Sequence, residues 1–143
     1  MMENITFKNN KIDTVFIIDD DEDDCYLLKE AIAESGMNLK CTVFINGLEA
    51  IEYLKKHLNA LPNIIFLDLN MPKMGGKDFL KEIIKNPLLK NIPVTVYSTS
   101  RIPLDVEETK ILGAIHYIAK PYSFDELRQQ VRLVFKMLVH TEA

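Results

Sequence analysis

Short apolar runs that end directly in charged residues are the feature of this sequence that most constrains its fold. Residues 15–18 are followed by three aspartates, residues 64–67 by Asp68, and residues 115–119 by Lys120. Apolar runs of this length between turn-forming residues are typical of parallel strands buried on both faces. In open α/β sheets, ligands bind outside the carboxyl ends of such strands. The pattern therefore predicts that charged side chains far apart in the sequence meet at one edge of a sheet.

Strand-like and helix-like segments alternate along the chain. Strands are expected at residues 14–18, 39–44, 63–67, 92–97 and 115–118, and helices at residues 23–35, 46–58, 76–85, 103–112 and 123–138. Because crossovers between parallel strands are right-handed, this alternation leaves few possible topologies. We predict an α/β fold, a (βα)5 doubly wound parallel five-stranded sheet with the flavodoxin-like strand order 2-1-3-4-5.

The apolar stripes of the expected helices predict which side chains point into the core. The expected inward residues are Leu28, Ala31, Ile32 and Ser35; Ile51, Leu54 and Leu58; Phe79, Leu80, Ile83 and Ile84; Val106, Ile111 and Leu112; and Phe124, Leu127, Val131, Val134 and Leu138. Asn46 and Ser123 are expected N-caps, and Gly36 and Pro87 are expected to end helices. The segment 103–112 has few inward residues for its length, so we expect it to be the most loosely held helix.

Composition narrows the class of protein. The chain has 143 residues, of which 48% are hydrophobic and 27% charged, as in one globular domain. We expect a short leader at residues 1–12, one domain at residues 13–140 and no further domain. The net charge of −4 provides no broad basic face for nucleic acid. Cys25 and Cys41 lack metal-binding spacing and are expected to be reduced. Without a signal-like or membrane-length apolar segment, a cytoplasmic protein is expected.

The acidic residues after the first strand predict a metal site. The chain has no glycine-rich phosphate-binding motif. Instead Asp19 and Asp20, together with Asp68, can supply carboxylate oxygens to one Mg²⁺. The alternative is capping of the following helix, which suits the aspartates at positions 21, 23 and 24. For Asp19 and Asp20 we favour metal binding, because two carboxylates at one strand end repel each other when no cation is present.

Three further residues suit the handling of a phosphoryl group. Asp68 can act as a nucleophile towards phosphorus and form an acyl phosphate, although an aspartate after a strand can also simply start a turn. Ser98, at the end of the fourth strand, can donate a hydrogen bond to a phosphoryl oxygen. Lys120 offers a flexible positive charge suited to phosphate. The combination is much more specific than any of these residues alone.

These residues resemble the active-site pattern of the receiver domain of bacterial two-component response regulators, over about residues 13–138. The resemblance rests on the pair Asp19-Asp20, on Asp68 in Asp-Leu-Asn-Met-Pro, on Ser98 in Tyr-Ser-Thr-Ser, and on Lys120-Pro121. The stretch from Asp19 to Asp24 and the residues Tyr97-Ser98-Thr99-Ser100 also look similar to standalone receivers paired with sensor kinases, including phytochrome-type kinases. By this resemblance, residues 13–140 are a receiver domain that lacks an output domain.

The resemblance also assigns roles to residues. It implies that Asp68 is the phosphoacceptor, and that Ser98 and Lys120 hold the phosphoryl group. It implies that Asp20 and the backbone carbonyl of Asn70 contact Mg²⁺ directly, and that Asp19 binds the ion through water or positions it. Tyr117 corresponds to the switch aromatic of the family, with a packed sheet-edge tyrosine as the alternative.

The function implied by the resemblance is a phosphorylation-activated signalling switch. A sensor histidine kinase or a histidine phosphotransfer protein donates the phosphoryl group to Asp68 in the presence of Mg²⁺. We expect the phosphorylated protein to pass on its signal by binding a downstream protein, or a second copy of itself, through the face formed by residues 103–138. Binding to nucleic acid or to a membrane is not expected. The protein catalyses only its own phosphorylation and slow dephosphorylation, so it is not expected to be a metabolic enzyme.

Two other classes use related folds. A phosphatase of the haloacid dehalogenase type would place a second aspartate two residues after the nucleophile, where this chain has Asn70. A flavodoxin-like flavin carrier would bind the flavin phosphate with a loop rich in Ser, Thr and Gly. In this chain that phosphate would instead meet the carboxylates after the first strand, which argues against a flavin carrier.

Overall fold

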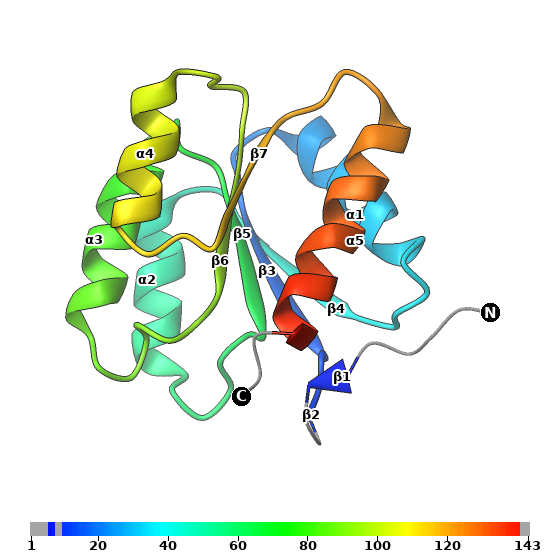
Figure 1. Cartoon of the computed structure of the whole chain (residues 1–143). Coiled ribbons are helices and arrows are strands. Elements are labelled where there is room, and N and C mark those ends of the chain that lie inside the picture. Colours follow the sequence, from blue (N-terminus) through cyan, green and yellow to red (C-terminus); the bar gives the residue numbers. More distant parts are fainter. Residues whose placement is uncertain (1–5, 8–9, 141–143) are drawn as a thin grey trace.

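The structure, a computed structural model, describes residues 6–7 and 10–140 and is built around a parallel five-stranded sheet (Figure 1). The strands of this sheet are β3 (Thr14–Ile18), β4 (Lys40–Phe44), β5 (Ile64–Leu67), β6 (Val94–Ser98) and β7 (His116–Ala119). Their order is β4-β3-β5-β6-β7, and every neighbouring pair is parallel. Counted along the chain, this is the predicted order 2-1-3-4-5, so the predicted fold is confirmed.

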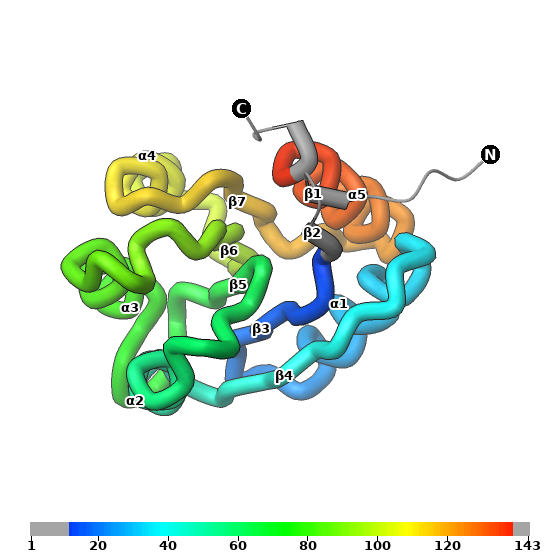
Figure 2. Tube along the Cα trace, turned by 90° about the horizontal axis from the view of Figure 1, so that it is seen from below, coloured from blue at the N-terminus to red at the C-terminus, as the bar shows by residue number. Residues whose placement is uncertain are grey.

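Helices cover both faces of the sheet (Figure 2). The helices are α1 (Glu22–Ala33), α2 (Gly47–Lys56), α3 (Gly76–Lys85), α4 (Pro103–Ile111) and α5 (Phe124–His140). Helices α1 and α5 lie on one face, and α2, α3 and α4 lie on the other. Side chains alternate along each strand, so Val15 and Ile17 join the core beneath α1 and α5, whereas Phe16 and Ile18 join the opposite core.

The predicted caps set where three helices begin and end. The Asn46 side chain accepts a hydrogen bond from the backbone N–H of Glu49 at 2.8 Å, and Ser123 accepts one from Glu126 at 3.1 Å. Gly36 follows α1 with a φ of 84°, a left-handed conformation that favours glycine. These local signals were readable from the sequence because each satisfies an end of a helix that would otherwise leave backbone groups unpaired.

Four predicted inward residues are wrong. Leu58 is exposed because α2 ends at Lys56, and Ile84 lies on the outer side of α3. On α4, Val106 and Ile111 are exposed as well. The buried residue of α4 is Thr109, whose hydroxyl satisfies itself by donating to backbone carbonyls of its own helix. The apolar residues of α4 therefore do not mark its inner face.

Part of the expected leader forms strands that the sequence analysis did not predict. Strands β1 (Thr6–Phe7) and β2 (Asn10–Lys11) pair antiparallel. Ile12, the last residue of the expected leader, is buried in the core beneath α1 and α5. The core therefore includes a residue before position 13, while leader residues 1–5 and 8–9 lie outside the described part of the chain.

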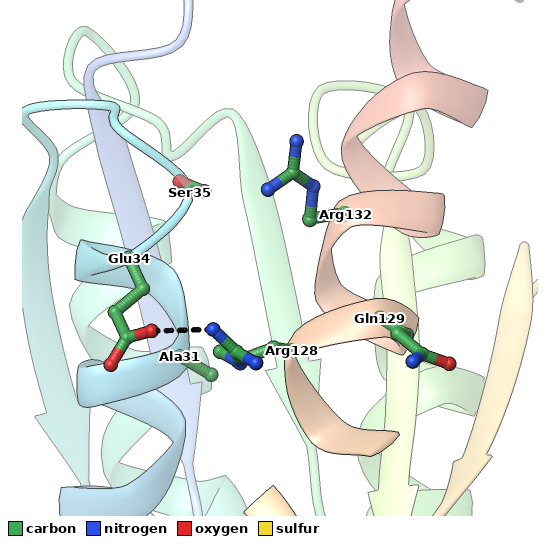
Figure 3. Close-up of a pocket in the computed structure, with 6 residues that line it drawn as sticks. All are labelled: Ala31, Glu34, Ser35, Arg128, Gln129 and Arg132. Atoms are coloured by element: carbon green, nitrogen blue, oxygen red, sulfur yellow. Dashed lines mark hydrogen bonds and ion pairs between the residues drawn. The ribbon is translucent and has the colours of Figure 1, made fainter. Parts of the chain in front are cut away.

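An ion pair between the end of α1 and α5 involves two of the residues that line a small surface pocket (Figure 3). The Arg128 guanidinium donates to the Glu34 carboxylate at 3.0 Å and also contacts Asp125 on its own helix. The pocket has a volume of about 260 Å³ and is lined by Ala31, Glu34, Ser35, Arg128, Gln129 and Arg132. None of the predicted site residues lines it. Among the described residues, no helix is both long and apolar enough to cross a membrane.

Candidate functional site

The ends of three strands bring the predicted site residues together. Asp19 follows β3, Asp68 follows β5, and Lys120 follows β7. Each backbone N–H donates to a carbonyl oxygen of the neighbouring strand and so extends the hydrogen bonding of the sheet by one residue. The acceptors are the carbonyls of Phe44 for Asp19 at 2.9 Å, Ile18 for Asp68 at 2.9 Å and Ser98 for Lys120 at 2.7 Å. The rigid sheet therefore fixes the origin of all three side chains, as the pattern of apolar runs predicted.

Three carboxylates form the acidic part of this site. One oxygen from each of Asp19, Asp20 and Asp68 lies within 4.8 Å of the others. Asp19 and Asp68 are buried, whereas Asp20 is exposed. Burial raises the pKa of Asp68 to about 6, and the charge of Asp19 adds to this rise while Lys120 opposes it. Burial also raises the pKa of Asp19. Closely spaced, partly dehydrated carboxylates are the donors that a hard divalent cation prefers, so these residues fit such an ion.

The Lys120 ammonium lies among carboxylates. Its Nζ is 2.6 Å from Asp24 Oδ2, 2.9 Å from Asp19 Oδ2 and 3.9 Å from Asp68 Oδ1. Burial alone would lower the pKa of Lys120, but the hydrogen bonds to Asp24 and Asp19 outweigh it and raise that pKa. Lys120 is therefore positively charged at neutral pH.

The sequence analysis missed Asp24, which it assigned to helix capping. The N-cap of α1 is Asp21, whose side chain accepts from the backbone N–H of Asp24. The Asp24 side chain instead reaches Lys120. A signal was present: Asp24 stands four residues before the buried Leu28, so both lie on the same side of α1. A carboxylate on the inner side of a helix is stabilised by a nearby cation, although the spacing does not identify which cation.

Two glycines shape the loop that follows Asp68. A Cβ atom on Gly76 would lie 2.4 Å from the backbone oxygen of Asp68, and one on Gly75 would lie 3.0 Å from that of Leu69. The Gly76 N–H donates to the Leu69 carbonyl at 3.0 Å. Glycine therefore lets the start of α3 approach the backbone of the site. Asn70, the predicted carbonyl ligand, lies exposed in this loop.

Ser98 and Tyr117 are linked through Ser100. Ser98 is fully buried, and its Oγ accepts a hydrogen bond from the Ser100 N–H at 3.2 Å. The half-buried Tyr117 donates its hydroxyl to the Ser100 carbonyl at 2.8 Å. The Ser100 hydroxyl donates to Asp105 in the first turn of α4. One residue thus connects the end of β6, the edge strand β7 and helix α4.

The chain belongs to the family of response regulator receiver domains, whose sequence pattern it matches over residues 15–132. The resemblance found in the sequence is thereby confirmed, and the two alternative classes are set aside. Receiver domains are the phosphorylation-activated switches of two-component signalling, and this protein is such a switch.

Among its relatives, the chain is 31% identical to the response regulator Rcp1 of Synechocystis sp. over 129 residues, which cover 87% of this chain and 88% of Rcp1. The structure of the Mn(2+)-bound form of Rcp1 has a TM-score of 0.78 at 30% identity, and covers 92% of this chain and 97% of that one. The phosphorylated cyanobacterial phytochrome response regulator RcpA has a TM-score of 0.81 at 34% identity, with 92% and 96% covered.

Longer proteins contain a similar segment. The DNA-binding transcriptional regulator NtrC of Escherichia coli strain K12 is 33% identical over 127 residues, which cover 88% of this chain but only 25% of NtrC. That likeness therefore concerns one part of NtrC alone.

Proposed function

We propose that Asp68 is the residue that accepts the phosphoryl group, from a phosphohistidine on a sensor histidine kinase or a histidine phosphotransfer protein. The observation that carries this proposal is the position of the buried Asp68 carboxylate, 3.9 Å from the Lys120 ammonium and within 4.8 Å of the oxygens of Asp19 and Asp20. In the transfer, a bond forms between an Asp68 oxygen and phosphorus while the bond from phosphorus to the histidine nitrogen breaks.

The divalent ion of this site is Mg²⁺ in our proposal, held by Asp19, Asp20, Asp68 and the backbone carbonyl of Asn70. The spacing of the three carboxylates and their all-oxygen chemistry support it. The Mn(2+)-bound form of the relative Rcp1 supports a divalent ion as well. When bound, Mg²⁺ neutralises negative charge on the phosphoryl oxygens.

Lys120 and Ser98 hold the phosphoryl group in this proposal. The ammonium of Lys120 has three N–H donors, and the hydrogen bonds to Asp19 and Asp24 use two of them. A third donor is left for a phosphoryl oxygen. Ser98 accepts a hydrogen bond from Ser100 through its Oγ, so its own O–H proton can be donated to another phosphoryl oxygen.

The response passes from Ser98 to Tyr117 and α4. When Ser98 turns towards the phosphoryl group, its bond to the Ser100 N–H is strained or lost. Ser100 also holds Tyr117 and Asp105, so a shift of its backbone changes the face formed by α4, β7 and α5, residues 103–138. We propose that this face binds a downstream protein or a second copy of the chain. We also propose that the receiver domain comprises residues 13–140. The phosphorylated structure of the relative RcpA is in keeping with such a switch.

A phosphorylation assay tests this function. Incubation with acetyl phosphate and Mg²⁺ should add one acid-stable, base-labile phosphoryl group, seen by intact-protein mass spectrometry. Asp68→Asn should abolish the modification. Asp23→Asn, which removes an exposed carboxylate nearby, should retain it. Labelling that persists in Asp68→Asn would assign the chemistry to another residue.

A further inference from the structure

We propose that Asp24 is a positioning residue that draws the Lys120 ammonium away from Asp68 and thereby weakens the hold of the site on a phosphoryl group. This inference rests on the proposed function, in which Lys120 contacts the phosphoryl group.

The distances show which carboxylate the ammonium favours. Lys120 Nζ lies 2.6 Å from Asp24 but 3.9 Å from Asp68, beyond the usual length of a hydrogen bond. The Lys120 side chain is only 9% exposed, compared with 25% for Asp24. The ring of Tyr97 also contacts the ammonium, with its centroid 5.0 Å from Nζ. Lys120 is therefore largely shielded from water, and its position depends on the nearest charges.

A phosphoryl group on Asp68 changes this balance. It brings negative charge and strong acceptor oxygens to the side of the ammonium where Asp68 lies. The third N–H donor of Lys120 is available for these oxygens, but Nζ lies 2.6 Å from Asp24 and 3.9 Å from Asp68, so a close bond to the phosphoryl group requires the ammonium to move towards Asp68 and away from Asp24. Asp24 is partly exposed, so water can replace the lysine there, but the short ion pair is lost or lengthened. The ion pair therefore stabilises the unphosphorylated protein relative to the phosphorylated one.

Asp23 provides a matched control. Asp23 and Asp24 are adjacent in the first turn of α1, so replacing either by asparagine removes one charge and has a similar effect on the helix dipole. Asp23 is exposed, whereas Asp24 is bonded to Lys120. A difference between the two variants therefore reports on the bond to Lys120 rather than on net charge.

The test measures the affinity of the full chain for beryllofluoride, a phosphoryl mimic, in saturating Mg²⁺ by NMR titration. Asp24→Asn should bind beryllofluoride about three- to thirtyfold more tightly than the wild type, and Asp23→Asn within about twofold of it. In a Lys120→Ala background, Asp24→Asn should have the same effect as Asp23→Asn, because the lysine through which it acts is absent. The side-chain ammonium signal of Lys120 should also shift in unliganded Asp24→Asn but not in Asp23→Asn.

Three results would overturn the inference: equal affinities for the two asparagine variants, weaker binding by Asp24→Asn, or an undiminished effect in the Lys120→Ala background. Failure of the proposed function looks different. In that case the wild type does not bind beryllofluoride, or Asp68→Asn binds it as well as the wild type does.

Discussion

Asp68 occupies a position where a carboxylate is poorly tolerated in the metal-free protein. Its side chain is 8% exposed and faces two other carboxylates, with one lysine at 3.9 Å. The placement of this carboxylate therefore costs stability, as is common for residues of functional sites.

The stability cost at Asp68 is measurable as a function of pH. Because its pKa is raised from 3.8 to about 6, the contribution of Asp68 to stability is full below pH 4 and is lost as the pH rises through 6. With metal removed, Asp68→Asn should therefore be more stable than the wild type at pH 7.5, by about 1–3 kcal/mol. The difference should shrink towards pH 4. Urea unfolding between pH 4 and 8 in the presence of EDTA measures it, and a less stable variant at pH 7.5 would contradict the expectation.

Asp20 should separate metal binding from folding. We expect Asp20→Asn to weaken Mg²⁺ binding at least about tenfold, because one oxygen ligand loses its charge. The metal-free variant should be as stable as the wild type or more so, because repulsion within the acidic group falls. Calorimetric Mg²⁺ titration and urea unfolding give the two quantities, with Asp23→Asn as control. A clear loss of stability in metal-free Asp20→Asn would favour the capping role instead.

At the scale of elements, Ser100 is one of the residues that attach α4 to the rest of the fold. Its hydroxyl donates to Asp105, and Lys77 of α3 binds the same carboxylate at 2.6 Å and Glu108 at 2.5 Å. The apolar residues of α4 contribute little burial. The helix is therefore held at its start by polar contacts that a small change in the backbone of Ser100 can alter.

Removing the Ser100 hydroxyl should loosen α4. We expect Ser100→Ala to increase amide hydrogen exchange across 103–111 severalfold, because the bond to Asp105 and the bond that the hydroxyl accepts from Ile102 are both lost. Thr99→Ala removes an exposed neighbouring hydroxyl and should leave exchange unchanged. Equal protection of α4 in the two variants would mean that other contacts hold the helix.

Lys120 should be required for β6 and β7 to respond to phosphorylation. In Lys120→Ala, beryllofluoride should bind weakly, or bind without the NMR shift changes that the wild type shows in these two strands. The reason is that the ammonium is the cation closest to Asp68 among the described residues. Identical shift changes in the two proteins would refute this coupling.

The sequence predicted the sheet and the bounds of α4 well but the inner face of α4 poorly, for a physical reason. Strands such as β5 are buried on both faces, so their apolar residues carry an unambiguous signal. Helix α4 buries Thr109 rather than its Val and Ile residues, so its hydrophobic pattern points away from its packing face. The site residues at strand ends were predictable because strand ends converge. The pairing of Asp24 with Lys120 depends on how α1 is rotated against the sheet, which the sequence alone left open.

At the scale of the whole molecule, the net charge of −4 gives the protein no attraction to the phosphate backbones of DNA. We therefore predict output through protein contact on the α4, β7 and α5 face. Light scattering after size exclusion, with and without beryllofluoride, should show a change in self-association, or a pull-down in the two states should capture a partner that binds one state only. Tight, phosphorylation-dependent binding to duplex DNA at physiological salt would contradict this prediction.

The close approach of Gly76 to the backbone of Asp68 means that the two sides of the site differ in how easily they can move. On the α3 side, Gly75 and Gly76 lie so close to the carbonyl oxygens of Leu69 and Asp68 that a Cβ atom on Gly76 would clash, so the backbone of Asp68 has little room to move in that direction. On the α4 side, exchangeable hydrogen bonds to Ser100 can yield. In the proposed function, we therefore expect phosphorylation of Asp68 to alter the α4 side more than the α3 side, so a partner that senses it should bind on the α4 side. Replacing Gly76 by a larger residue would therefore displace the backbone of Asp68 itself.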